Sequence, residues 1–424
     1  MPAPRYKWYV VGMLWWICFF NYADRQAIFS VFPLLEKEFG LTLAQLGWLG
    51  SSFGIVYGLC APFAGSVVDR VRRKSAILGG LHAWSAICMA TALSRGFGPL
   101  LFFRAAEGLG ETFYFPASMS LLSDYHGKAT RSRALGLHQT SVYIGTIAGG
   151  YFAGLVGQRY GWRWSFVVFG GLGILLGLVL RRYLIEAERG AAEAQVGVST
   201  VGARGAAKNT SRRASGISVR AWLTPTLAIL LAAFLCANFV AVVVLTWMPK
   251  FLYDKFHLSL AAAGLTATVF IQLASMVGAP AGGWLADRLR ARRPGGRMMV
   301  QAAGLLCGAP FVVLCGLTQS IAWLMAALTA WGFFKGLYDA NIFAAMFDVV
   351  PPESRGTATG IMNMVGWLGG GGAAPVVIGY IAERQSLGFA IALASAVYVA
   401  GAALLIAGVL LFIRRDAARM EPAR

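Results

Sequence analysis

Hydrophobic residues make up 58% of the 424-residue chain, and charged residues only 13%. A soluble domain carries roughly 25% charged residues, so this composition excludes a soluble domain and predicts a polytopic membrane protein. The net charge of +19 is therefore expected on loops at a membrane face, and a nucleic-acid-binding surface is not expected, because no basic patch is interleaved with aromatic residues.

The chain contains twelve apolar runs of about 20 residues, the length that crosses a bilayer as a helix. These runs predict an all-α fold of twelve transmembrane helices. They lie near residues 8–30, 43–67, 74–93, 98–122, 132–156, 162–181, 223–253, 261–286, 298–317, 320–347, 357–382 and 387–413.

An internal repeat divides the chain into two halves of six spans each. The pattern G-x-x-x-D-R occurs at Gly65 to Arg70 and again 218 residues later, at Gly283 to Arg288, each time where an apolar run ends. A proline before each copy and an aspartate–arginine pair in a later loop also repeat. These residues are Pro62 and Pro280, Asp124 and Arg131, and Asp348 and Arg355. Such parallel repeats are typical of duplicated transporters.

Loop composition predicts the domain boundaries and the topology. Residues 182–222 are rich in Ala, Gly, Ser and Arg and are predicted to be a linker between an amino-terminal bundle, 1–181, and a carboxy-terminal bundle with a short tail, 223–424. The amino terminus, the even-numbered loops and the tail hold 27 of the 37 basic residues, against 7 in the odd loops. By the positive-inside rule, both termini are expected to be cytoplasmic.

Several kinds of site are not supported by the sequence. All six cysteines fall inside predicted spans without C-x-x-C spacing, so neither a disulfide framework nor a metal site is expected. No nucleotide-binding P-loop and no hydrolytic motif is present, so we expect no enzyme and no cofactor. Energy for transport should come from an ion gradient.

Ionisable residues inside three predicted spans are the strongest functional signal. Each would cost roughly 2.5–3.5 kcal/mol at the centre of a bilayer, so the set must face a watery cavity or pair internally. Pairing for structure alone is the simpler interpretation; the concentration of the charges at similar depth favours a cavity. They are Asp24, Arg25, Arg104, Glu107, Glu111, Lys335 and Asp339.

Helical spacing predicts which of these side chains share a face. Arg104, Glu107 and Glu111 follow the i, i+3, i+7 pattern of one face. Under a 224-residue offset of the second half, Lys335 is the counterpart of Glu111, so the repeat places opposite charges at equivalent depth. Asp24 is adjacent in sequence to Arg25 and therefore points about 100° away from it around the helix.

Two sets of motifs resemble known families. The segment from Gly65 to Lys74 resembles the loop 2–3 signature of the major facilitator superfamily. Asn21-Tyr-Ala-Asp24-Arg25 and the R-x-x-x-G-x-G-E pattern from Arg104 to Glu111 resemble signatures of Spinster-type transporters and of the anion:cation symporters. A segment of span 7 is closer to the sugar-acid symporters, so the branch stays open. It is Thr246-Trp-Met-Pro-Lys-Phe-Leu252.

The resemblance implies a mechanism in which Asp24 and Glu111 take up and release protons, while Arg25 and Arg104 bind an anionic group. Elementary electrostatics agrees, since burial favours a neutral carboxyl group and a paired arginine favours the charged one. Glu107 and Asp339 are expected to be supporting charges. Further substrate contacts are predicted from their depth near these charges, namely Lys335, Tyr114, Asn238, Tyr338 and Asn341.

The loop motifs are predicted to form a conformational gate at the cytoplasmic ends of the spans. In the superfamily that the motif resembles, such residues bridge the two halves when the outer side is open. The alternative is a set of charges that only determine topology. The gate residues would be Gly65, Asp69, Arg70, Arg73, Asp124, Arg131, Asp287, Arg288, Asp348 and Arg355. Four consecutive glycines, 369–372, predict a bend or unwinding in span 11.

The sequence thus predicts a proton-coupled secondary transporter that moves a small organic anion by alternating access, as a monomer in a plasma membrane, most simply a bacterial inner membrane. The main alternative is a Spinster-type exporter of lysophospholipid or sphingoid-like lipids. A multidrug antiporter is less favoured because span 5 lacks a Gly-Pro pair, and a non-transporting receptor would not need buried charges in both halves.

Overall fold

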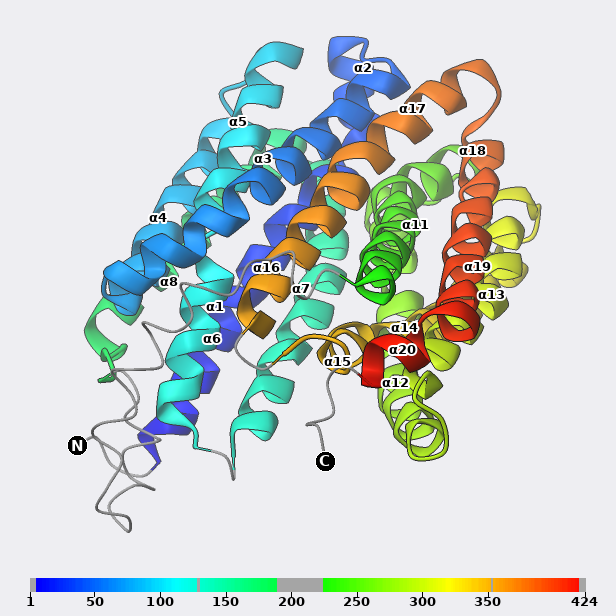
Figure 1. Cartoon of the computed structure of the whole chain (residues 1–424). Coiled ribbons are helices and arrows are strands. Elements are labelled where there is room, and N and C mark those ends of the chain that lie inside the picture. Colours follow the sequence, from blue (N-terminus) through cyan, green and yellow to red (C-terminus); the bar gives the residue numbers. More distant parts are fainter. Residues whose placement is uncertain (1–4, 128–129, 189–223, 352–353, 419–424) are drawn as a thin grey trace.

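The computed structural model describes residues 5–127, 130–188, 224–351 and 354–418, and all regular structure in these ranges is helical (Figure 1). The amino-terminal half comprises α1 (Tyr6–Ser30), α2 (Phe32–Phe39), α3 (Leu43–Arg70), α4 (Arg73–Thr91), α5 (Phe97–Glu111), α6 (Tyr114–Tyr125), α7 (Arg131–Tyr160) and α8 (Trp162–Tyr183).

The carboxy-terminal half repeats this order with more interruptions. It comprises α11 (Pro225–Phe256), α12 (Leu260–Arg290), α13 (Gly296–Leu317), α14 (Ile321–Asp339), α15 (Ile342–Phe347), α16 (Arg355–Gly366), the π-helix η3 (Trp367–Ala373), α17 (Ala374–Arg384), α18 (Leu387–Leu393), α19 (Ser395–Leu411) and α20 (Ile413–Ala418).

Each of the twelve predicted apolar runs coincides with one helix or with two or three consecutive helices, which confirms the expected all-α membrane fold. By length and hydropathy alone, eight spans of the described chain qualify as membrane-crossing. Among the spans that do not qualify are α1 and the α5–α6 pair, which carry buried charged side chains. The predicted linker lies mostly outside the described residues, so its boundaries stay predictions.

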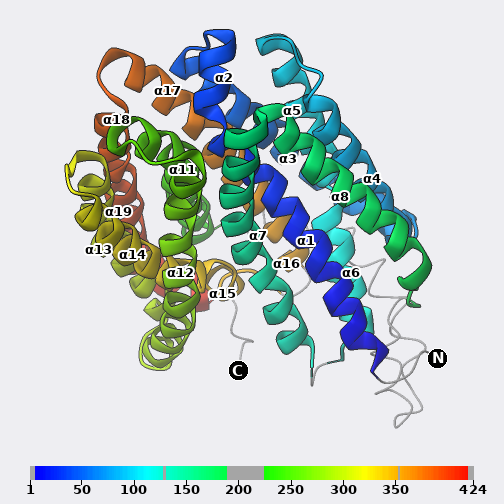
Figure 2. The same ribbon diagram turned by 180° about the vertical axis from the view of Figure 1, so that it is seen from behind.

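Local sequence explains where the helices end. Gly40 adopts a left-handed conformation (φ 62°) that stops α2, and Thr42 and Gln45 then form a capping box that starts α3. Gly161, with φ 91°, allows the chain to turn sharply between α7 and α8. Short connections of this kind place consecutive helices antiparallel, as Figures 1 and 2 show.

We call the side of the bundle where α1 begins and α20 lies the terminal face, and the side with α2 and the α17–α18 connection the opposite face (Figure 1). The halves meet through two equivalent helix pairs. In one, α3 packs on η3 and α17; in the other, α7 packs on α12. These are spans 2 with 11 and 5 with 8, which exchange under the repeat, so the predicted duplication is visible in the packing.

Glycine permits the closest approach between the halves. A Cβ atom on Gly54 of α3 would lie 2.2 Å from the carbonyl carbon of Gly371 in η3, and a Cβ on Gly150 of α7 would lie 2.6 Å from the carbonyl oxygen of Gly264 in α12. Contacts this short leave no room for a side chain. The glycine run in span 11, predicted to bend or unwind, forms the π-helix η3 against α3.

Polar contacts between the halves lie toward the opposite face. Lys250 of α11 pairs with Glu36 of α2, and the Ala44 amide donates to Glu383 at 2.8 Å. The side-chain amide of Gln26 donates to the carbonyl of Leu245 at 3.0 Å. All of these residues sit near helix ends that reach the opposite face. The described structure is therefore joined on that face.

Replacing Gly54 by Val is expected to separate α3 from η3 and so weaken the contact between the halves, since overpacking typically costs 1–3 kcal/mol. The arrangement that brings Gly54 against Gly371 would lose population. Spin labels at Lys37 and Arg384, one exposed position on each half near the opposite face, would then report longer distances. The matched control is Gly79→Val in α4, because a Cβ atom there meets nothing within 4 Å. An unchanged distance distribution in the Gly54 variant would contradict the prediction.

Candidate functional site

One face of α5 carries the three ionisable residues that helical spacing grouped together. Arg104, Glu107 and Glu111 are each 1% exposed. Gly108, within the same segment, lets α5 approach α3 closely, because a Cβ atom there would lie 2.7 Å from the carbonyl oxygen of Phe53. The glycines of the signature therefore have a packing role that brings the charged face against the neighbouring helices.

Two ion pairs organise the buried charges. The guanidinium of Arg25 in α1 donates to Glu111 in α5, and Arg104 donates to Glu107 one turn away on α5. The structure therefore brings together the charged groups of spans 1 and 4, as their calculated depths predicted. Asp24 is 3% exposed and, among the described residues, forms neither an ion pair nor a hydrogen bond.

Four aromatic rings surround Arg25. Its guanidinium carbon lies 4.8 Å from the ring centre of Tyr22, 4.9 Å from those of Phe53 and Tyr57, and 5.3 Å from that of Trp367. Cation–π attraction of this kind holds a guanidinium without neutralising it. We call these four rings the aromatic cage.

The aromatic cage was missed by the sequence analysis. Only Tyr22 carries a local signal, because it lies three residues before Arg25 on the same helix. Phe53 and Tyr57 come from α3, and Trp367 begins the π-helix of the other half. No sequence spacing connects these three elements.

A central pocket of about 840 Å³ extends from the cage toward the terminal face. Tyr22, Tyr57 and Trp367 line its inner end, while Ser66 and Gly356 line it close to the terminal-face ends of α3 and α16. Its other walls come from α6 and α16 and are mainly apolar. They include Phe115, Pro116, Met119, Ile361 and Met364. Arg25 does not itself line the pocket, but three of its cage rings do, so its positive charge lies directly behind the inner end.

In the second half, Lys335 and Asp339 of α14 form an i, i+4 ion pair, and their side chains are 16% and 29% exposed. Tyr143 of α7 interacts electrostatically with Lys335 across the halves. Lys335, the predicted counterpart of Glu111, is therefore paired with a carboxylate of its own helix. This pair is separate from the ion pairs of α1 and α5.

Four predicted substrate contacts are engaged in packing. The hydroxyl of Tyr114 donates to the carbonyl of Leu14 at 2.7 Å. Asn341 donates to the carbonyl of Gly282 at 3.2 Å, and Asn238 to that of Gly366 at 2.6 Å. Tyr338 is 2% exposed in the hydrophobic core. Within the described residues none of them lines the central pocket, so their role in binding stays a prediction.

The predicted gate residues that the structure describes form contacts within each half. Arg73 pairs with Asp124 and with Glu186, 3.0 Å away. Arg297, 224 residues after Arg73, pairs with Asp348 at 2.7 Å and with Asp287 at 2.9 Å. The repeat therefore includes this arginine, which the sequence analysis did not select although the offset would have revealed it.

The remaining gate residues also stay within their own half. Arg131 donates to the carbonyl of His126 at 3.1 Å, and Arg355 donates to that of Phe347 at the same distance. Arg288 stacks on Trp284 at 5.3 Å, and Arg70 is exposed. Gly65 lines the central pocket. The side chain of Asp69 lies outside the described part of the structure, so the gate stays a prediction.

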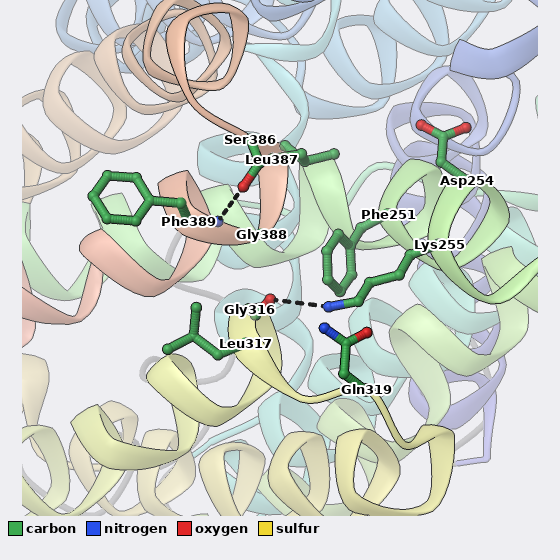
Figure 3. Close-up of a pocket in the computed structure, with 10 residues that line it drawn as sticks. All are labelled: Phe251, Asp254, Lys255, Gly316, Leu317, Gln319, Ser386, Leu387, Gly388 and Phe389. Carbon is green, nitrogen blue, oxygen red and sulfur yellow. Dashed lines mark hydrogen bonds between the residues drawn. The ribbon is translucent and has the colours of Figure 1, made fainter.

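A second pocket, of about 430 Å³, lies on the carboxy-terminal half near the opposite face (Figure 3). There Lys255 reaches the carbonyl oxygen of Gly316 at 3.5 Å, and Ser386 accepts a hydrogen bond from the Phe389 amide at 3.1 Å. Its walls come from the ends of α11 and α13 and the start of α18. None of the buried charges of α1 and α5 lines it.

Comparison with known proteins identifies the family. The model of the Major Facilitator Superfamily matches residues 14–374 and 295–424. The chain belongs to this superfamily. It is a multi-pass membrane transporter. The relatives are named as transporters and the superfamily is not a family of enzymes, which confirms the prediction that this chain is not an enzyme.

Two branches of the superfamily contain similar proteins. The chain is 26% identical to the D-galactonate transporter of Escherichia coli O6:H1, covering 91% of this chain and 90% of that protein. It is 28% identical to protein spinster homolog 1 of Homo sapiens, covering 99% and 83%. These matches confirm both resemblances drawn from the motifs of spans 1 and 4.

Among solved structures, the chain is similar to a bacterial homolog of the human lysosomal transporter Spinster in an inward-facing and unoccupied conformation. The TM-score is 0.78 at 22% identity, and 99% of each chain is covered. At this identity the match establishes the fold. It agrees with the twelve-helix architecture described above.

The two repeated ion-pair clusters should differ in strength. Asp124→Asn is expected to lower the free energy of unfolding by about 1–3 kcal/mol, because it removes a charged partner from an arginine that is only 1% exposed. Asp348→Asn should cost less than about 1 kcal/mol, since Arg297 is 23% exposed. Thermal unfolding of purified protein would measure both. Asp287→Asn, at a side chain that is 72% exposed, is the control. Equal losses at Asp124 and Asp348 would contradict the prediction.

Proposed function

We propose that this chain is a proton-coupled secondary transporter that moves an organic anion across the membrane by alternating access. The observation that carries the proposal is the Arg25–Glu111 ion pair, which lies behind the aromatic rings that line the inner end of the central pocket. A substrate anion and Glu111 would compete for the same guanidinium. When the anion takes Arg25, Glu111 loses its counter-charge and becomes a proton acceptor in an apolar environment.

The predicted topology indicates to which side of the membrane the central pocket opens. On the positive-inside count, the terminal face is the cytoplasmic one. The pocket then opens toward the cytoplasm, while the contacts at Lys250, Ala44 and Gln26 close the outer side. This arrangement corresponds to an inward-facing state in a bacterial inner membrane. Alternating access would break these outer contacts and join the halves on the terminal face.

The nature of the anion is supported by the relatives and by the pocket lining. The E. coli relative is named for D-galactonate, a sugar acid, and the aromatic cage offers flat faces on which a sugar ring can stack. A lipid is the second candidate, because Phe115, Met119 and Met364 offer an apolar path for an acyl chain. Both candidates have an anionic group that Arg25 can bind.

Ligand-dependent stability is the direct test of the proposed substrate class. A panel of sugar acids, other carboxylates, phosphorylated metabolites and lysolipids should contain a compound that raises the unfolding temperature of purified protein. Binding to the folded state alone adds about 2.7 kcal/mol at a hundredfold excess over the dissociation constant. The shift should be lost in Arg25→Ala and kept in Arg384→Ala, at an exposed arginine distant from the pocket. A shift confined to lysolipids would move the chain to the lipid-exporter alternative.

Proton coupling is tested by transport in reconstituted vesicles. Asp24→Asn and Glu111→Gln are each expected to abolish accumulation of the anion driven by a pH gradient, because the carboxyl group that must carry the proton is gone. Exchange of labelled for unlabelled anion across the vesicle membrane should continue, since it needs no net proton movement. Full pH-driven uptake in both variants would refute coupling through these residues.

A further inference from the structure

The buried charges of the amino-terminal half do not balance. Three carboxyl groups and two guanidinium groups lie between α1 and α5, and each of these residues is at most 9% exposed. The two ion pairs use both arginines and two of the carboxylates. If every group is ionised, one negative charge remains. A buried charge without a partner is strongly unfavourable, so this cluster requires one additional positive charge.

The geometry indicates where that charge is held. Ligand atoms of Asp24, Glu107 and Cys88 all lie within 4.8 Å of one another. The Oδ1 atom of Asp24 and the Oε1 atom of Glu107 are both buried and have no hydrogen-bond partner in the described structure. If one carboxyl group is protonated and the two side chains close to hydrogen-bond distance, both oxygens are satisfied, because the protonated group donates a hydrogen bond that the other accepts.

We propose that Asp24 and Glu107 share a single bound proton, and that Glu111 remains ionised for as long as it is paired with Arg25. This inference rests on the proposed transport function and assigns its proton to a particular pair of carboxyl groups. Binding the proton changes the charge of the five-residue cluster from −1 to zero. Glu111 would then accept a proton only after the substrate has displaced it from Arg25.

The other groups around Asp24 are consistent with this assignment. From its own helix comes Arg25, which is held in the aromatic cage by its ring contacts and by Glu111. From α5 come Arg104, Glu107 and Glu111, and from α4 comes Cys88. On the α7 side, Gly149 packs against Ala23 and brings no ionisable group.

The same surroundings favour a proton over a metal ion. The sulfur of Cys88 lies 3.7 Å from the carbonyl oxygen of Phe166, a contact in which a thiol donates a hydrogen bond, and a thiol is a poor metal ligand. Hard cations such as sodium prefer several oxygen ligands, and only two carboxylates are present here. Arg104, paired with Glu107, adds repulsion toward a second cation.

Glu107 lies at a position that the signature motif of α5 leaves open. It occupies one of the variable positions in the R-x-x-x-G-x-G-E pattern that runs from Arg104 to Glu111. The pattern itself does not require a carboxyl group there. The third buried carboxyl group, and with it the uncompensated charge, comes from this one residue.

Infrared spectroscopy of the purified full-length protein tests the proposal without a substrate. The carbonyl stretch of a protonated carboxyl group, sensitive to exchange into D₂O, should be present at neutral pH. Asp24→Asn and Glu107→Gln should each remove it, because each leaves two carboxylates to balance two arginines. The double variant Arg25→Gln/Glu111→Gln should retain it, since it removes one charge of each sign and leaves the Asp24–Glu107 pair with one negative charge in excess. Glu107→Asp keeps a carboxyl group and should show a displaced band, which separates a lost proton from a misfolded variant.

Three results would overturn the inference. The first is a band that survives in Asp24→Asn and Glu107→Gln, and the second is a band that is lost in the Arg25→Gln/Glu111→Gln double variant. The third is a wild-type band removed by sodium chloride or zinc chloride but not by choline chloride, which would assign the pair to a metal ion. Vesicle assays keep the two proposals apart. Normal pH-driven anion uptake without the band refutes only the shared proton, whereas the band without any uptake refutes the transport function.

Discussion

Neutralising charge inside an apolar bundle is the constraint on which the amino-terminal half depends. The carboxyl and guanidinium groups of α1 and α5 cannot reach bulk water, so they must lie against one another. Gly108 allows α5 to come close to α3, and the Arg25–Glu111 pair ties α1 to α5. On the helix of the carboxy-terminal half that corresponds to α5, the Lys335–Asp339 pair is less buried. The chemistry is therefore concentrated in one half of a duplicated fold.

The length of the apolar runs was sufficient to predict twelve spans, since each run coincides with helix. Spacing also predicted that Arg104, Glu107 and Glu111 share a face. It could not predict which carboxylate each arginine takes, because positions three and seven residues away are both on that face. Only the positions of α1 and α5 in the folded bundle decide that Arg25 takes Glu111 and that Asp24 is left without a partner.

Other features depend on tertiary structure from the start. Tyr114 was selected for its depth, but its hydroxyl donates to the carbonyl of Leu14 and the residue does not line the central pocket. Rotation about a helix axis is hard to predict when all faces are apolar. The aromatic cage is a second example, because Phe53, Tyr57 and Trp367 come together only after both halves have folded. Repeats were more informative than motifs, as the equivalent positions of Arg73 and Arg297 show.

The π-helix η3 links the binding region to the joint between the halves. Trp367, its first residue, stacks over Arg25 and lies 4.9 Å from the ring of Tyr57 in α3. Four residues later, Gly371 packs against Gly54 of the same helix α3. Interior π-helices are rare and are frequently found at functional sites. Because one short segment makes both contacts, a movement that separates α3 from η3 also withdraws Trp367 from Arg25. In the proposed transport cycle, opening of the opposite face would therefore also release the caged arginine.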